Sequence, residues 1–177
     1  MTNRAVFLDR DGVINRVTVR DGRPHPPSSL DELEILPQVS EAIEEIRKAG
    51  FLIIVVTNQP DVATGVQQQA VVEAIHHQIQ ETCRIDEIKV CYHVDADMCS
   101  CRKPKPGMIL TAGAEWSLDL ENSFMVGDRW QDVEAGQAAG CQTIFIDAGY
   151  DERKPGSPDA SVISLLEASQ FILSSMV

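Results

Sequence analysis

Residues 5–12 read AVFLDRDG, an apolar run that ends abruptly in two carboxylates, Asp9 and Asp11, followed by Gly12. A short apolar run of this kind is typical of a buried strand. Side chains two residues apart on an extended chain lie on the same side of it. The two acids are therefore expected to face one substrate at the end of the strand.

Strands and helices are expected to alternate along the rest of the chain. Residues 51–56, FLIIVV, form a continuous apolar run typical of a parallel strand that is covered on both faces. The further expected elements are helices over 39–49, 68–83, 107–116, 130–139 and 165–173, and strands over 88–92, 123–126, 142–146 and, weakly, 160–163. This alternation predicts the α/β class, as a three-layer α/β/α sandwich around a mostly parallel, Rossmann-like sheet.

The 177 residues are expected to form a single domain, because no linker or repeat divides residues 1–177. Residues 16–29 and 148–159 are expected to be long loops that shape a site or move. No apolar stretch reaches the length of about 18 residues that a membrane span needs, and the first residues do not resemble a signal peptide. We therefore expect a cytoplasmic protein without membrane partners, and a monomer, because no apolar stripe is left over.

The net charge is −12, which disfavours a nucleic-acid partner. An acidic protein can still bind an anionic group locally, through backbone amides, a few basic side chains and a divalent cation. A small phosphorylated molecule is thus compatible with the composition, whereas a polyanion is not expected.

Polar residues follow several of the expected strands. Thr57 and Asn58 come after residues 51–56, Asp128 follows the strand over 123–126, and Asp132 lies one helical turn later. The carboxyl ends of parallel strands meet at one edge of a sheet, where ligands bind. These side chains are therefore expected to gather around Asp9 and Asp11.

The gathered residue types suit phosphoryl transfer. Mg²⁺ prefers oxygen ligands, which Asp9 and Asp128 can supply. One carboxylate can attack phosphorus while a second, Asp11, moves protons. Lys103 and Thr57 would hold the phosphate oxygens.

Each stretch by itself also has a purely structural explanation. A D-x-D sequence can be a surface turn, Thr57 and Asn58 can cap a helix or form a turn, and Asp132 can be an exposed residue early in a helix. Their order, each just past a strand, favours a shared site. Spacing does not choose between Lys103 and Lys105, which both precede a helix.

Residues 91–101, CYHVDADMCSC, contain four potential metal ligands: Cys91, His93, Cys99 and Cys101. Three thiolates and one imidazole suit tetrahedral zinc in a closed structural site, and clustered cysteines in a reducing compartment favour metal over disulfides. The alternatives are a C-x-C redox pair or unrelated buried thiols. The sequence therefore predicts a zinc-binding loop that leads into the basic stretch RKPK.

The stretches FLDRDGVIN, VVTNQ, CRKPKPGM and VGDRWQD resemble, in order, the four motifs of the haloacid dehalogenase (HAD) superfamily of phosphohydrolases. The resemblance implies a HAD-like fold and a phosphoric monoester hydrolase that works through an aspartyl-phosphate. It implies the roles of nucleophile for Asp9, general acid/base for Asp11, phosphate or substrate binding for Thr57, Asn58 and Lys103, and Mg²⁺ ligation for the carboxylates of Asp9 and Asp128 and the backbone carbonyl of Asp11. Asp132 would be a supporting residue, and the R-K-P pattern favours Lys103 over Lys105.

The cysteine loop resembles that of the D-glycero-D-manno-heptose 1,7-bisphosphate phosphatases and of the related histidinol-phosphate phosphatases. The resemblance implies a protein without a separate cap domain, and Arg102 and Arg129 as contacts to the phosphate that is not cleaved. A 7-phosphatase acting on the heptose bisphosphate is expected, with histidinol phosphate or another sugar phosphate as alternatives. One departure is Thr64, where relatives often carry an arginine.

The first long loop offers Arg20, Arg23 and His25 as possible substrate contacts, a question that the sequence leaves open. A protein of another class, a zinc-stabilised binding module with an inactive phosphate site, would fit the same pattern. It is disfavoured because every catalytic position is filled.

Overall fold

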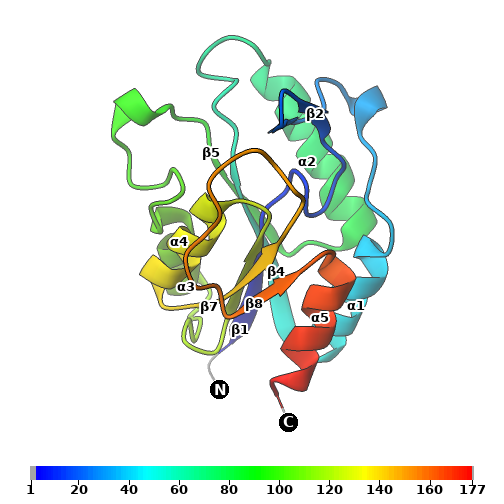
Figure 1. Cartoon of the computed structure of the whole chain (residues 1–177), viewed down its shortest axis with the longest axis vertical. Coiled ribbons are helices and arrows are strands. Elements are labelled where there is room, and N and C mark those ends of the chain that lie inside the picture. Colours follow the sequence, from blue (N-terminus) through cyan, green and yellow to red (C-terminus); the bar gives the residue numbers. More distant parts are fainter. Residues whose placement is uncertain (1–2, 177) are drawn as a thin grey trace.

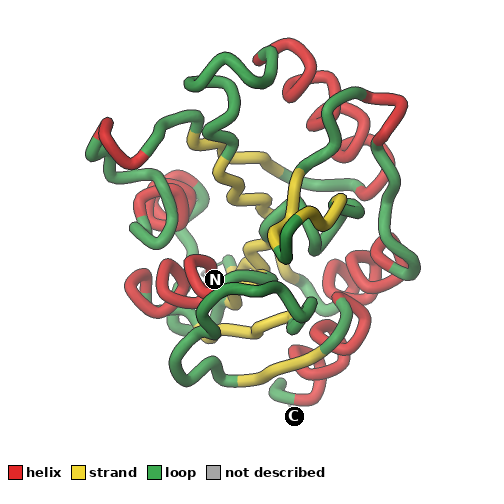
Figure 2. Tube along the Cα trace, turned by 45° about the horizontal axis from the view of Figure 1, so that its top comes forward, coloured by secondary structure: helices red, strands yellow, loops and turns green. Residues whose placement is uncertain are grey.

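The computed structural model describes residues 3–176, in which a parallel sheet lies between two groups of helices (Figures 1 and 2). The sheet has the order β5-β4-β1-β6-β7-β8, and each neighbouring pair is parallel. The strand bounds are Arg4–Leu8 (β1), Phe51–Asn58 (β4), Glu87–Cys91 (β5), Phe124–Gly127 (β6), Gln142–Ile146 (β7) and Ala160–Val162 (β8). The helix bounds are Val39–Lys48 (α1), Gln69–Cys83 (α2), Gly107–Glu115 (α3), Trp130–Ala139 (α4) and Leu165–Ser174 (α5).

The central strand β1 is buried on both of its faces. Val6 and Leu8 belong to a core that includes apolar residues of α1, α2 and α5. Ala5 and Phe7 belong to a second core, with residues of α3 and α4. The strand is apolar at every position from 5 to 8 because both faces are covered. The predicted α/β sandwich with its parallel sheet is thereby confirmed.

A small hairpin stands in the segment that was predicted to be a loop. Its strands are Thr18–Arg20 (β2) and Arg23–His25 (β3), and they pair antiparallel through a turn at Asp21 and Gly22. The loop prediction for residues 16–29 is therefore wrong in this part. Three-residue, largely exposed strands give no hydrophobic period, although the Asp-Gly pair, with φ of 50° and 73°, is a known hairpin signal.

The other connections are mostly irregular. Single turns of 3₁₀ helix occur at Leu30–Glu32 (η1) and Asp95–Asp97 (η2), whereas residues 148–159 contain neither helix nor strand. This last segment touches the hairpin, because the Asp151 amide donates to the Gly22 carbonyl over 2.9 Å. Within residues 3–176, no helix has the length and apolar character needed to cross a membrane.

Candidate active site

A cleft of about 240 Å³ lies at the carboxyl ends of β1, β4 and β6. The residues singled out from the sequence that line it are Asp9, Asp11, His25, Asn58, Lys103, Arg129 and Asp132. The hairpin contributes His25, while Arg20 and Arg23 are exposed and do not line the cleft. The parallel topology thus brings together side chains from positions 9 to 132 of the chain.

Lys103 is the cation at the floor of the cleft. Its Nζ atom donates to Asp9 Oδ1 (2.8 Å), Asp132 Oδ1 (2.6 Å) and the Val56 carbonyl (2.8 Å). Burial by itself lowers the pKa of Lys103, but the carboxylates of Asp132 and Asp9 outweigh it and raise the pKa above its usual range. The side chain, 4% exposed, therefore stays an ammonium.

Asn58 fixes the segment that carries Lys103. The Asn58 side chain accepts from the Lys103 amide and donates to the Lys103 carbonyl, each over 3.1 Å. Lys105, the alternative candidate, instead reaches the Cys99 carbonyl at 2.6 Å and is exposed. The structure therefore brings Lys103, and not Lys105, to Asp9.

Three buried carboxylates surround this ammonium. Oxygens of Asp9, Asp128 and Asp132 lie within 4.8 Å of one another. Burial raises the pKa of Asp9 to about 6 although Lys103 opposes the shift, and burial together with the charge of Asp9 raises the pKa of Asp128 well above its usual value. Oδ2 of Asp128 accepts from the Tyr150 hydroxyl (2.7 Å), while its buried Oδ1 atom has no hydrogen-bond partner. A crowded oxygen-only donor set with an unpaired buried oxygen fits a divalent cation such as Mg²⁺.

Asp11 is held by three donors. Arg10 forks onto its two oxygens from Nε and NH2 over 2.9 to 3.1 Å, Asn15 donates at 3.0 Å and Gln59 at 2.8 Å. Burial would raise the pKa of Asp11, but the charge of Arg10 and these hydrogen bonds outweigh it and lower the pKa. Arg10 is itself buried and shares its remaining NH1 group with His76 Nε2 on α2, over 2.9 Å.

Thr57 is buried and is not one of the residues that line the cleft. It is 1% exposed at the end of β4, and its hydroxyl accepts from Gln59 Nε2 over 2.9 Å. Gln59 therefore bridges Thr57 and Asp11.

Gly12 allows the chain to turn against the carboxylate cluster. Its φ is +83°, and a Cβ atom there would lie 1.9 Å from Asp128 Oδ2 and 2.7 Å from the Tyr150 hydroxyl. Only glycine fits a left-handed backbone that approaches another side chain so closely.

The two predicted arginines are both paired with acids. Arg129 is the N-cap residue just before α4 and donates to both oxygens of Glu152. Arg102 donates from Nε to Asp95 (2.6 Å) and lines a separate hollow beside the cysteine loop. The structure thus brings Arg129 to the cleft and turns Arg102 away from it.

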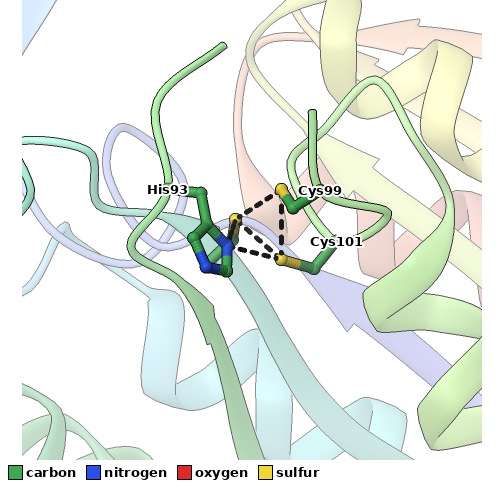
Figure 3. A group of neighbouring side chains, drawn as sticks. His93, Cys99 and Cys101 are labelled. Carbon is green, nitrogen blue, oxygen red and sulfur yellow. Dashed lines mark hydrogen bonds between the residues drawn. The ribbon is translucent and has the colours of Figure 1, made fainter. Parts of the chain in front are cut away.

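Four predicted zinc ligands converge at the end of β5. Their donor atoms lie within 4.8 Å of one another: Cys91 Sγ, His93 Nδ1, Cys99 Sγ and Cys101 Sγ. The sulfur–sulfur distances are 3.7, 3.5 and 2.9 Å, and His93 Nδ1 lies 3.3 Å from Cys101 (Figure 3). Tetrahedral zinc with bonds of about 2.3 Å would separate two sulfurs by roughly 3.8 Å. The Cys91–Cys99 and Cys99–Cys101 distances are close to this value, whereas the Cys91–Cys101 distance of 2.9 Å is shorter, so these two sulfurs would have to move apart to hold zinc.

Several residues of the site escaped the sequence analysis. Tyr150 and Glu152 come from the irregular segment 148–159, and His76 comes from the inner face of α2, at a position typical of core residues. The sequence predicts that residues 148–159 shape a site or move but gives no reason to choose Tyr150 or Glu152 within them. His76 follows the apolar period of α2 and therefore looks like an ordinary core position. Their roles follow from tertiary contacts with Asp128, Arg129 and Arg10.

Known proteins resemble this chain over nearly its whole length. A family model described as HAD-hydrolase-like matches residues 100–168. D-glycero-beta-D-manno-heptose-1,7-bisphosphate 7-phosphatase of Pseudomonas aeruginosa is 37% identical over 163 residues, 89% of each chain. The protein of the same name from Escherichia coli K12 is 34% identical over 185 residues, covering 97% of this chain and 89% of the relative.

Among solved structures, a D,D-heptose 1,7-bisphosphate phosphatase from B. bronchiseptica, complexed with magnesium and phosphate, superposes with a TM-score of 0.84. It is 28% identical and covers 97% of this chain and 99% of its own.

Proposed function

We propose that this chain, which belongs to the HAD-like hydrolase family and is a phosphatase, removes the phosphate at carbon 7 of D-glycero-β-D-manno-heptose 1,7-bisphosphate. The supporting observation in the molecule is the placement of Lys103 between Asp9 and Asp132, at the floor of the cleft. This arrangement suits a dianionic phosphoryl group that is attacked by Asp9.

The reaction has two steps. Asp9 attacks phosphorus to form an acyl phosphate, and Asp11 gives a proton to the departing sugar oxygen. Asp11 then takes a proton from a water molecule that attacks the acyl phosphate, which releases inorganic phosphate and restores Asp9. The lowered pKa of Asp11 favours the ionised form, which the second step requires, whereas the first step requires the protonated form.

The phosphoryl oxygens are held by side chains of the protein, and a bound cation would offset their charge. Lys103 and Thr57 bind them as negative charge develops, and Asn58 keeps Lys103 in place. The carboxylates of Asp9 and Asp128, with the Asp11 carbonyl, would hold Mg²⁺, which would offset the charge of the phosphoryl group when bound. The unpaired Asp128 Oδ1 atom supports this assignment.

Asp9→Asn tests the chemistry, because the amide is isosteric with the carboxylate but is not a nucleophile at phosphorus. We expect no measurable phosphate release from the heptose bisphosphate with Mg²⁺, and an unchanged far-ultraviolet circular dichroism spectrum. Undiminished activity in this variant would refute the mechanism. If the wild-type protein turns over histidinol phosphate faster than the heptose bisphosphate, histidinol phosphate becomes the better substrate assignment. If the wild-type protein cleaves none of a panel of phosphate esters, a binding module is favoured.

We propose that the cysteine loop binds one structural zinc ion per chain. Cys99→Ser should lower the zinc content measured by elemental analysis and reduce kcat, because the loop leads directly to Lys103. Cys83→Ser changes a thiol outside the cluster and should retain the zinc. Wild-type protein purified without zinc, yet fully active, would overturn the assignment.

The proposed setting is the cytoplasm, and the proposed working form is a monomer. None of the five cysteines is in a disulfide, and a reducing compartment favours that state. Analytical ultracentrifugation at micromolar concentration should give a mass near 19.5 kDa.

A further inference from the structure

Glu152, in the segment after β7, already occupies one edge of the guanidinium at the wall of the cleft. Arg129 Nε lies 3.0 and 3.1 Å from the two Glu152 oxygens, and its NH2 nitrogen lies 2.6 Å from one of them. The pair is partly shielded from water, since 37% of the Arg129 side chain and 17% of the Glu152 side chain are exposed. Only the other edge of this guanidinium remains for a substrate.

Glu152 is held in place by its chain neighbours. Two residues earlier, the Tyr150 hydroxyl donates to Asp128. One residue later, the guanidinium of Arg153 stacks over the Trp130 ring, 3.6 Å from its centroid. The carboxylate therefore stands against Arg129 before any substrate enters.

The positive charge of the cleft is more than matched by acidic side chains. Among the described residues that line it, Lys103 and Arg129 are the lysines and arginines, and Lys103 is bound to Asp9 and Asp132. A second phosphate, remote from the reacting one, would have to meet Arg129 because Lys103 lies beside the nucleophile. It would meet a guanidinium whose charge Glu152 already balances.

We propose that Glu152 determines how strongly the enzyme distinguishes a sugar bisphosphate from a monophosphate, by neutralising Arg129 and keeping its affinity for the remote phosphate low. This inference rests on the proposed function, whose substrate carries two phosphates. The same guanidinium without a carboxylate partner would bind phosphate through two parallel charge-assisted hydrogen bonds. Glu152 thus allows the remote phosphate to be bound weakly and released.

The test compares heptose 1,7-bisphosphate with heptose 7-phosphate in the presence of Mg²⁺. Glu152→Gln keeps the size of the side chain and removes its charge. We expect KM for the bisphosphate to fall about fivefold to tenfold, which is the size of one charge-assisted contact. KM for the monophosphate and kcat for both should stay unchanged, a split that a loss of folding would not produce.

Two further variants localise the effect. In an Arg129→Gln background, Glu152→Gln should no longer change the ratio of the two KM values, because the pair acts as a unit. Glu121→Gln removes one negative charge from an exposed position that precedes β6, at the other end of the strand from Asp128, and should leave the ratio unchanged.

An unchanged or higher KM for the bisphosphate in Glu152→Gln would overturn the proposal, since Glu152 would then merely orient Arg129 or contribute nothing. If the wild-type protein cleaves neither heptose phosphate, the proposed function fails. The role of Glu152 is still decided in that case, by calorimetric Kd values for both compounds with Mg²⁺ on the Asp9→Asn background, with and without Glu152→Gln.

Discussion

At the scale of single residues, the site depends on charges that are buried together. Lys103 faces Asp9 and Asp132 over 2.8 and 2.6 Å, and one ammonium cannot balance three clustered carboxylates. Burial and, after it, the charge of Asp9 raise the pKa of Asp128, and its Oδ1 atom has no hydrogen-bond partner. The site as the chain builds it is therefore incomplete without a cation.

Gly12→Ala adds only one methyl group, but it should displace the residues of this carboxylate cluster. The new methyl group would lie 1.9 Å from Asp128 Oδ2, so Asp128 or the backbone of Asp11 must move. We expect kcat/KM to fall at least about 100-fold, because a displacement near 1 Å has that effect on catalysis.

Gly50→Ala is the matched control for this substitution. Gly50 also has a positive φ, +87°, but a Cβ atom there would meet nothing within 4 Å. It should reduce the free energy of unfolding by about 1 kcal/mol through backbone strain alone and leave kcat/KM unchanged. Equal activity losses in the two variants would show that the clash at Gly12 is not the cause.

At the scale of elements, the sequence predicts what depends on burial and misses what depends on loop contacts. The run over 51–56 has to be covered on both faces, so β4 and its partner strands follow from composition. The parallel topology that these buried strands require then places Asp9, Asp128 and Lys103 at one edge of the sheet. The ion pairs of Arg102 and Arg129 depend on how two irregular segments fold over the sheet, and local sequence does not determine that.

Helix α2 contributes a titratable group that its apolar period conceals. Burial, with the charge of Arg10, lowers the pKa of His76 to about 4 from an unfolded value near 6.5. Between pH 6.5 and pH 4, the unfolded chain binds a proton at His76 that the folded chain does not bind. The stability that the neutral His76 contributes is therefore fully present above pH 6.5 and is lost as the pH falls toward 4.

Urea denaturation at pH 7 and pH 5 measures this contribution. His76→Gln keeps an acceptor for Arg10, and we expect the loss of unfolding free energy between the two pH values to be smaller by about 2 kcal/mol than in the wild-type protein. His77→Gln changes the neighbouring exposed histidine, and this variant should lose as much unfolding free energy between pH 7 and pH 5 as the wild-type protein does. An identical pH dependence in all three proteins would contradict the assignment to His76.

At the scale of the whole molecule, a chain of net charge −12 has to bind an anionic substrate. The fold achieves this locally, because the sheet topology collects Lys103 and Arg129 at one edge while most acids remain on the outer surface. Cation binding at the carboxylate cluster would reduce the remaining repulsion, so the global stability and the active site are linked.

Magnesium should therefore stabilise the entire fold. A cation that binds only the folded state adds about 3 kcal/mol at one hundred times its Kd, which corresponds to roughly 5–10 °C in Tm for a domain of this size. Differential scanning fluorimetry with MgCl₂ should detect the rise in the wild-type protein and a much smaller one in Asp128→Asn. NaCl of equal ionic strength is the control, and an equal rise in NaCl would rule out specific binding.

The burial of Lys103 also bears on how the protein can be labelled. Its nitrogen is protonated and therefore has no free electron pair with which to attack an acylating reagent, and only 4% of its surface is accessible. Lys48 and Lys154 are 61% and 52% exposed on their side chains. Amine-reactive dyes or resins should consequently attach at these outer lysines and spare Lys103, so conjugates made under mild conditions keep the cleft intact.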